Sequence, residues 1–110
     1  MKHTQTLTSN ASVKLCETRK LEKDSMWECS VFIQGTFDSG TVTLSASCDG
    51  GATKINLRDV AGTLVAVTAN DLYNIRLGVP NRGTDTIELY ATMAGAGGSA
   101  NVAVVVFDNR

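Results

Sequence analysis

The sequence has few of the residues that catalytic and metal-binding sites require. It contains one histidine, His3, and three cysteines, Cys16, Cys29 and Cys48, without any C-x-x-C spacing. Zinc sites use closely spaced cysteine and histidine pairs, and nucleophilic catalysis needs a base beside a serine or cysteine. We therefore expect no metal, no cofactor and no catalytic residues, and predict that the protein is not an enzyme.

The cysteines also bear on the compartment. An odd number would leave one cysteine outside a closed disulfide framework. We expect reduced cysteines that pack as small apolar residues, with a disulfide between Cys29 and Cys48 as the alternative. The first ten residues contain no apolar stretch typical of a secretion signal, so we expect synthesis in the cytoplasm.

The chain has no excess of charge of either sign. Ten basic and eleven acidic residues give a formal net charge of −1, which does not suit binding by phosphate neutralisation. No apolar run approaches the roughly 20 residues that a membrane-spanning helix needs. We expect neither nucleic acid nor membrane as a partner.

Residues that favour β-strands are abundant instead. Thirteen threonines, eleven valines, four isoleucines and six aromatic residues account for 34 of 110 positions, alongside ten glycines and one proline. Such side chains fit a pleated, half-buried surface, and the glycines suit turns. The length supports a single domain, which we predict to be all-β.

Alternation of apolar and polar residues locates the strands, because a strand with one buried face has a period of two. In the clearest segments the predicted inward residues are Trp27, Cys29, Val31 and Ile33, then Val42, Leu44, Ala46 and Cys48. In the segment 41–48 the outward residues include Ser45 and Ser47. Weaker segments place Ile55, Leu57 and Tyr73 inward. The predicted strands are 27–34, 41–48, 53–58, 63–68, 72–79, 85–93 and 100–107, with a less regular one near 11–15.

Turn residues separate these segments at regular intervals. Residues 37–40 (Phe-Asp-Ser-Gly) predict a hairpin between the strands 27–34 and 41–48. Further aspartates recur every 10 to 14 residues, at Asp49, Asp59, Asp71 and Asp85, where turns favour them over catalytic roles. This spacing predicts a single antiparallel β-sandwich or jelly-roll-like barrel of about eight strands, although an up-and-down barrel fits it as well.

The first 26 residues differ from the rest of the chain. They hold half of the ten basic residues, and we expect a polar N-terminal arm and loop region at 1–26 followed by a β-sandwich domain at 27–110. Such a segment is either a solvated arm or an extension that becomes ordered on a partner. The candidate partner-binding residues here are Lys14, Arg19, Lys20 and Lys23.

Two aromatic residues add to these candidates. Phe32 and Tyr90 have outward parity among polar neighbours, and aromatic side chains are enriched at interface hot spots. The strand 100–107 is apolar on both faces, so it lies centrally in the fold or is covered by another subunit. A sugar-binding module is an alternative, but Trp27 and Tyr73 have inward parity and leave few exposed rings for stacking.

The segment 27–49, WECSVFIQGTFDSGTVTLSASCD, resembles small head decoration (cement) proteins of tailed bacteriophages. In those chains a tryptophan strand leads into Gln-Gly-x-Phe and a Gly-Thr-Val-Thr-Leu strand, followed by an Asp-Gly turn like Asp49-Gly50. A Leu-x-Asp-x-x-Gly corner, here Leu57, Asp59 and Gly62, comes next. The resemblance covers about residues 27–107 and leaves the first 26 residues outside it.

The resemblance implies a non-enzymatic structural protein on the capsid exterior of a virion. Its partner would be the major capsid protein, whose neighbouring subunits it would staple together, and it would form a homo-oligomer, a dimer or trimer. A phage tail or adaptor component and a carbohydrate-binding β-sandwich module are the alternative functions.

Overall fold

The computed structural model describes residues 2–17, 26–59, 61–78 and 87–108, which form nine strands. No helix in these ranges is long and apolar enough to cross a membrane. The strands are β1 (Lys2–Leu7), β2 (Ser12–Glu17), β3 (Met26–Thr36), β4 (Thr41–Ser47), β5 (Ile55–Asn56), β6 (Ala66–Val67), β7 (Asp71–Gly78), β8 (Glu88–Ala94) and β9 (Asn101–Asp108).

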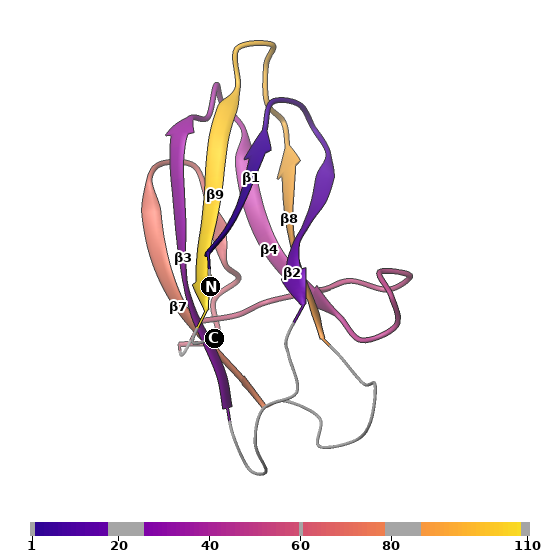
Figure 1. Ribbon diagram of the computed structural model, residues 1–110. Helices are drawn as coiled ribbons and strands as arrows, with labels where there is room; N and C mark the ends of the chain where they lie inside the picture. The colour runs from indigo at the N-terminus through magenta and orange to yellow at the C-terminus, as the bar shows by residue number, and fades with distance from the viewer. Residues whose placement is uncertain (1, 18–25, 60, 79–86, 109–110) are drawn as a thin grey trace.

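The strands form two antiparallel sheets that pack face to face (Figure 1). One sheet has the order β1-β9-β3-β7, and the other has the order β2-β8-β4-β5, with β6 also pairing with β4. The chain therefore passes to the opposite sheet after β1, β2, β3, β6, β7 and β8. This is the strand order of a jelly roll, with β5 and β6 together in the place of one edge strand. The predicted all-β sandwich is confirmed.

The predicted hairpin between residues 27–34 and 41–48 is wrong. Both strands exist, as β3 and β4, but β3 pairs with β7 and β9 while β4 pairs with β8. A tight turn does join them, since Asp38 and Ser39 have positive φ and Gly40 N–H donates to Phe37 O at 2.7 Å. The turn carries the chain across the sandwich, so that the two apolar faces meet in the core instead of lying side by side.

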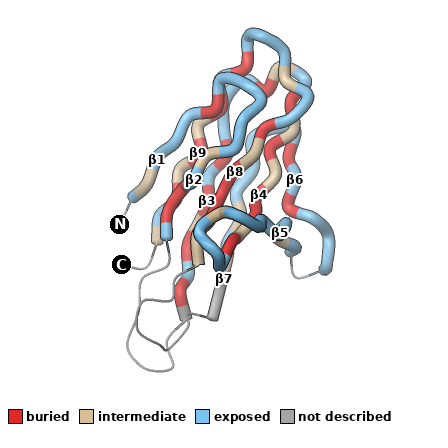
Figure 2. Tube along the Cα trace, turned by 90° about the vertical axis from the view of Figure 1, so that its right-hand side faces the viewer, coloured by how far each residue is buried: buried red, intermediate tan, exposed pale blue. Residues whose placement is uncertain are grey.

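The core lies between the sheets, where the alternating residues of the long strands meet (Figure 2). The inward parity predicted for the strand at 27–34 is confirmed, and Leu89, Ala91 and Met93 of the strand at 85–93 are buried. In the strand at 100–107, which is apolar on both faces, Val102, Val104 and Val106 face the core. The residues from these three segments that are at most 5% exposed are Trp27, Cys29, Val31, Ile33, Leu89, Ala91, Met93, Ala100, Val102, Val104 and Val106.

The N-terminal region is not a polar arm where the structure describes it. β1 and β2 belong to the two sheets, and Leu7, Leu15 and Cys16 join the core. β2 confirms the weak strand predicted near 11–15. Its pairing with β8 shifts between Lys14 and Cys16, so that Leu15 and Cys16 are both buried and simple alternation fails there. Residues 18–25 lie outside the described ranges.

The segment after β4 departs most from the predicted pattern. Residues 53–58 and 63–68 contribute only the two-residue strands β5 and β6, and Ile55, predicted inward, is 70% exposed. At the end of β4, Ser45 and Ser47 are buried and Cys48 is exposed, the reverse of the prediction. The alternation of single residues does not reveal that the following loop folds back over the outer face of β4 and β8.

Candidate functional site

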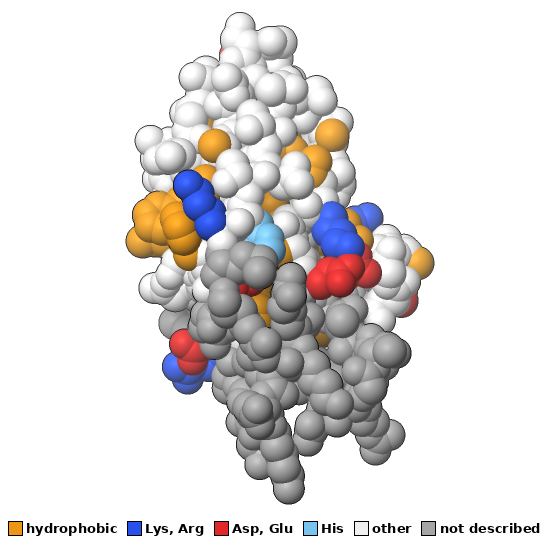
Figure 3. Space-filling view, viewed as in Figure 1, with side chains coloured by type: hydrophobic (Ala, Val, Ile, Leu, Met, Phe, Trp, Pro, Cys, Tyr) orange, Lys and Arg blue, Asp and Glu red, His pale blue; other side chains and the backbone are white. Residues whose placement is uncertain are grey.

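An apolar cluster occupies the outer face of the β1-β9-β3-β7 sheet. Phe32 on β3 lies opposite Leu72 on β7 and Val105 on β9, and Phe107 lies two residues further along β9. Phe32, Leu72 and Phe107 are 38%, 47% and 44% exposed. We call these four residues the aromatic cluster. Hydrophobic side chains gather on the left of Figure 3, over this sheet, with a basic side chain beside them.

The two phenylalanine rings hold each other in place. Their centroids are 5.7 Å apart and their planes lie at 81°, an edge-to-face arrangement that aromatic pairs favour. Lys2 is on the neighbouring strand β1, and its Nζ lies 5.7 Å from the centroid of the Phe107 ring. The rings are therefore fixed by neighbours on two strands while much of their surface faces solvent.

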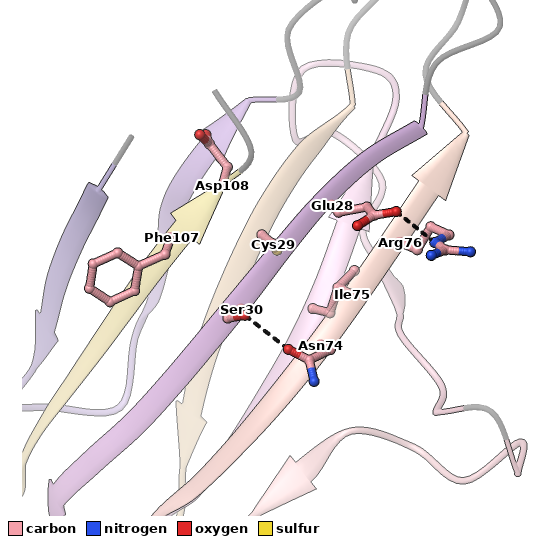
Figure 4. Close-up of a pocket in the computed structure, with 8 residues that line it drawn as sticks. All are labelled: Glu28, Cys29, Ser30, Asn74, Ile75, Arg76, Phe107 and Asp108. Carbon is pink, nitrogen blue, oxygen red and sulfur yellow. Dashed lines mark hydrogen bonds and ion pairs between the residues drawn. The ribbon is translucent and has the colours of Figure 1, made fainter.

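Polar residues border the aromatic cluster on the β7 side. Arg76 Nε forms an ion pair with Glu28 Oε1 at 3.0 Å, and Ser30 Oγ donates to Asn74 Oδ1 at 2.9 Å. Figure 4 shows each pair of side chains pointing toward one another across β3 and β7. With Phe107, these residues line a groove of about 540 Å³. An apolar centre with a polar rim is the usual anatomy of a protein–protein interface.

A His–Asp pair lies at the end of the same groove. Asp108 lines the groove, its side chain is only 1% exposed, and its Oδ2 lies 3.0 Å from Nε2 of His3 on β1. His3 lies in the region predicted to be a polar N-terminal arm, but this contact joins β1 to the end of β9. The pair therefore contributes to holding the first and last strands together.

The nearby cysteines do not provide a reactive thiolate beside this pair. Cys16 and Cys29 are buried and their thiols are free, and burial raises the pKa of each to about 12. A thiol with such a pKa is almost fully protonated at neutral pH and is a poor nucleophile. Within the described ranges no three histidine, cysteine, aspartate or glutamate side chains are grouped as metal ligands.

The predicted partner-binding residues that the structure describes do not form one surface. Phe32 lies in the aromatic cluster, but Lys14 is on β2, in the other sheet, paired with Glu17 and 3.6 Å from Glu88. Hydrogen bonding to Glu17 raises the pKa of the Lys14 ammonium, so the group stays charged and paired. Arg19, Lys20 and Lys23 lie outside the described ranges.

The prediction that Tyr90 is an exposed aromatic residue is wrong. It has outward parity as expected, but it is only 9% exposed because the loop after β4 covers it. Its hydroxyl donates to Glu88 Oε2 at 2.7 Å, which raises the pKa of the hydroxyl, and Lys54 Nζ lies 4.8 Å from the ring centroid. The Lys54 contact fastens the loop to β8, so Tyr90 has a structural role.

Sequence reasoning missed Leu72, Val105 and Phe107 as members of the cluster. The signal was present, since β9 is apolar at both parities, and β9 does lie between β1 and β3. Its outer face is nevertheless open, because no described segment covers the aromatic cluster. Comparisons with family models, curated proteins and solved structures gave no match for this chain.

Proposed function

We propose that this chain is a structural virion protein, a head decoration protein of a tailed bacteriophage, and that it docks on the outer capsid surface through the aromatic cluster. The observation that carries the docking surface is the exposed pair Phe32 and Phe107, with Leu72 beside them, inside a rim of Lys2 and the Glu28–Arg76 pair. Monomeric surfaces rarely expose several large apolar side chains together without an interaction role.

The remaining support comes from the fold and the resemblance. Jelly rolls are common in viral capsid proteins, although the same fold also serves lectins, so the fold alone does not choose between them. The turn and strand motifs at 27–62 resemble decoration proteins and favour the capsid. A rigid domain with one apolar surface suits a protein that holds others together without catalysis.

The proposed mechanism is stabilisation by binding. A domain that binds the assembled shell and not its separated subunits shifts the equilibrium toward the shell by mass action. Two or more linked copies would bind neighbouring subunits together, because the first contact raises the effective concentration of the second.

The test uses phage heads that lack this protein. Purified chain is added to the heads, and the heads are sedimented and then heated. We expect saturable co-sedimentation and disruption of the heads at a higher temperature. Absence of binding to heads rejects the proposal, and binding to isolated tails alone would assign the chain to the tail or adaptor alternative.

The groove favours one second candidate, a carbohydrate-binding module. Glu28, Ser30, Asn74 and Arg76 offer paired donors and acceptors beside the Phe107 ring, an arrangement that suits a neutral, hydroxylated ligand. A glycan array with the wild-type chain and an Asn74→Ala variant tests it. Binding that the variant loses supports this function, and no binding to any glycan rejects it.

A further inference from the structure

β7 is an open sheet edge. It pairs with β3 over eight consecutive residue pairs, Met26↔Gly78 to Ile33↔Asp71, without a register shift. No described strand lies on its other side, and Figure 1 shows β7 at the outer edge of the molecule. An edge strand presents unpaired backbone N–H and C=O groups, which are a template for pairing with another strand.

The other edges are protected in ways that β7 is not. β2 contains the register shift after Lys14, and β5 and β6 have two residues each. Bulges and short strands are the usual means of preventing edge pairing. β1 is regular, but its only buried side chain is Leu7, and its remaining residues are polar or charged.

The side chains of β7 are incompletely covered on both faces. Tyr73 and Ile75 face the core but are only half-buried, whereas Val31 on β3 and Val106 on β9 are 0% exposed. On the outer face Leu72 is 47% exposed. The apolar surface of β7 ends abruptly at the edge, as it would where a further strand belongs.

We propose that two copies of this chain pair through β7, antiparallel, with Asn74 opposite Asn74 of the second copy. This register sets Tyr73 opposite Ile75 twice, and aromatic and β-branched residues are a favourable cross-strand pair. It also sets Leu72 opposite the aliphatic stem of Arg76, and no two like charges face each other. Centring the pair on Tyr73 would instead set the Asp71 carboxylate against Ile75.

The pairing is isologous and closed, because a two-fold axis relates the two copies of one edge. It joins two four-stranded sheets into one continuous sheet. Both aromatic clusters then lie on the same outer face, so the dimer presents two docking surfaces in one direction. This consequence rests on the proposed capsid binding, but the pairing itself does not.

Sedimentation of the purified chain alone tests the pairing, with charges placed on the two-fold axis. The wild type is expected at twice the 11.6 kDa of one chain. Asn74→Asp and Asn74→Lys each place two like charges opposite one another, and each is expected to raise the dissociation constant of the dimer by about tenfold or more. An equimolar mixture of the two variants is expected to regain the dimer, since the charges are then opposite.

Thr4→Asp and Thr4→Lys are the matched controls, because Thr4 is exposed on the same sheet at its other edge. They should dimerise like the wild type, and circular dichroism checks that all four variants are folded. A wild type that stays monomeric at every concentration, or that forms a trimer, would overturn the proposal. So would a dimer that the Thr4 variants weaken and the Asn74 variants leave intact. Each of these results tests the pairing of β7 whether or not the protein binds phage heads.

Discussion

The edge of one ring of the Phe32–Phe107 pair meets the face of the other at 81°, and 5.7 Å separates their centroids. The two residues come from strands distant in sequence, and they are 38% and 44% exposed. Their mutual packing means that the surface offered to a partner is already ordered before binding, which lowers the entropic cost of docking.

This packing predicts a measurable coupling between the rings. A double-mutant cycle with Phe32→Ala and Phe107→Ala should give an interaction free energy of about 0.5–1.5 kcal/mol in urea unfolding. The cycle Phe32→Ala with Ile55→Ala, a residue 70% exposed on the other sheet, should be additive. Additivity in both cycles would show that the two rings do not stabilise one another.

Gly35 should not tolerate a side chain. Its φ is +139°, and a Cβ would overlap the backbone oxygen of Asn101 on the paired strand β9. Gly35→Ala is therefore expected to lower the free energy of unfolding by about 3 kcal/mol. Gly98→Ala is the control, because a Cβ there meets no atom within 4 Å. Equal unfolding midpoints for both variants would contradict the predicted close approach.

Asp38 joins two loops at one end of the sandwich. Its Oδ2 accepts a hydrogen bond of 2.8 Å from Ser99 N–H, and its own backbone oxygen accepts one of 2.9 Å from Gly97 N–H. Asp38→Ala removes the first acceptor at a residue with positive φ, so we expect a loss of about 1–2 kcal/mol. Asp38→Asn keeps an acceptor and tolerates this φ, and should cost less. A lower melting temperature for Asp38→Asn than for Asp38→Ala would rule this out.

Much of the fold follows from local sequence, and the sheet pairing does not. Alternation from Trp27 to Ile33 predicted the buried face of β3, because a period of two depends only on neighbouring residues. The predicted hairpin was wrong because the partners of β3 are β7 and β9, which are distant in sequence. The turn at Asp38 fits both a hairpin and a crossing between the two sheets. The prediction that Tyr90 is exposed was wrong for a similar reason, since its parity is outward but a separate loop covers it.

The candidate site shows the same division. Phe32 could be predicted because a single aromatic residue among polar neighbours stands out in one strand. Phe107 and Leu72 could not be assigned to it, since their proximity to Phe32 arises only from the pairing of β3 with β9 and β7. Lys14 was chosen from charge composition, and composition does not report that Glu17 and Glu88 pair with it.

The buried cysteines predict a loss of stability in alkali. Burial raises the pKa of Cys16 and Cys29 from an ordinary value near 9 to about 12, so the folded state binds more protons than the unfolded state between these values. The contribution of these thiols to the free energy of unfolding is then fully present below about pH 9 and is lost as the pH rises toward 12. Urea unfolding at several pH values measures this slope, and Cys16→Ala/Cys29→Ala should flatten it.

Cys48 provides the matched control for the cysteine prediction, because its side chain is exposed. Cys48→Ala should leave the alkaline slope unchanged, and an alkylating reagent should modify Cys48 in the folded protein before the two buried thiols. Rapid modification of all three thiols under native conditions would be inconsistent with the burial of Cys16 and Cys29.

Docking through the aromatic cluster is the central claim, and the most direct measurement is the affinity of ring variants for heads that lack the protein. Phe32→Ser and Phe107→Ser should each weaken head binding by about 30-fold, the effect of losing a hot spot of about 2 kcal/mol. Ile55→Ser removes an exposed apolar side chain from the opposite sheet and should bind like the wild type. If both phenylalanine variants bound heads with wild-type affinity, docking through this face would be wrong.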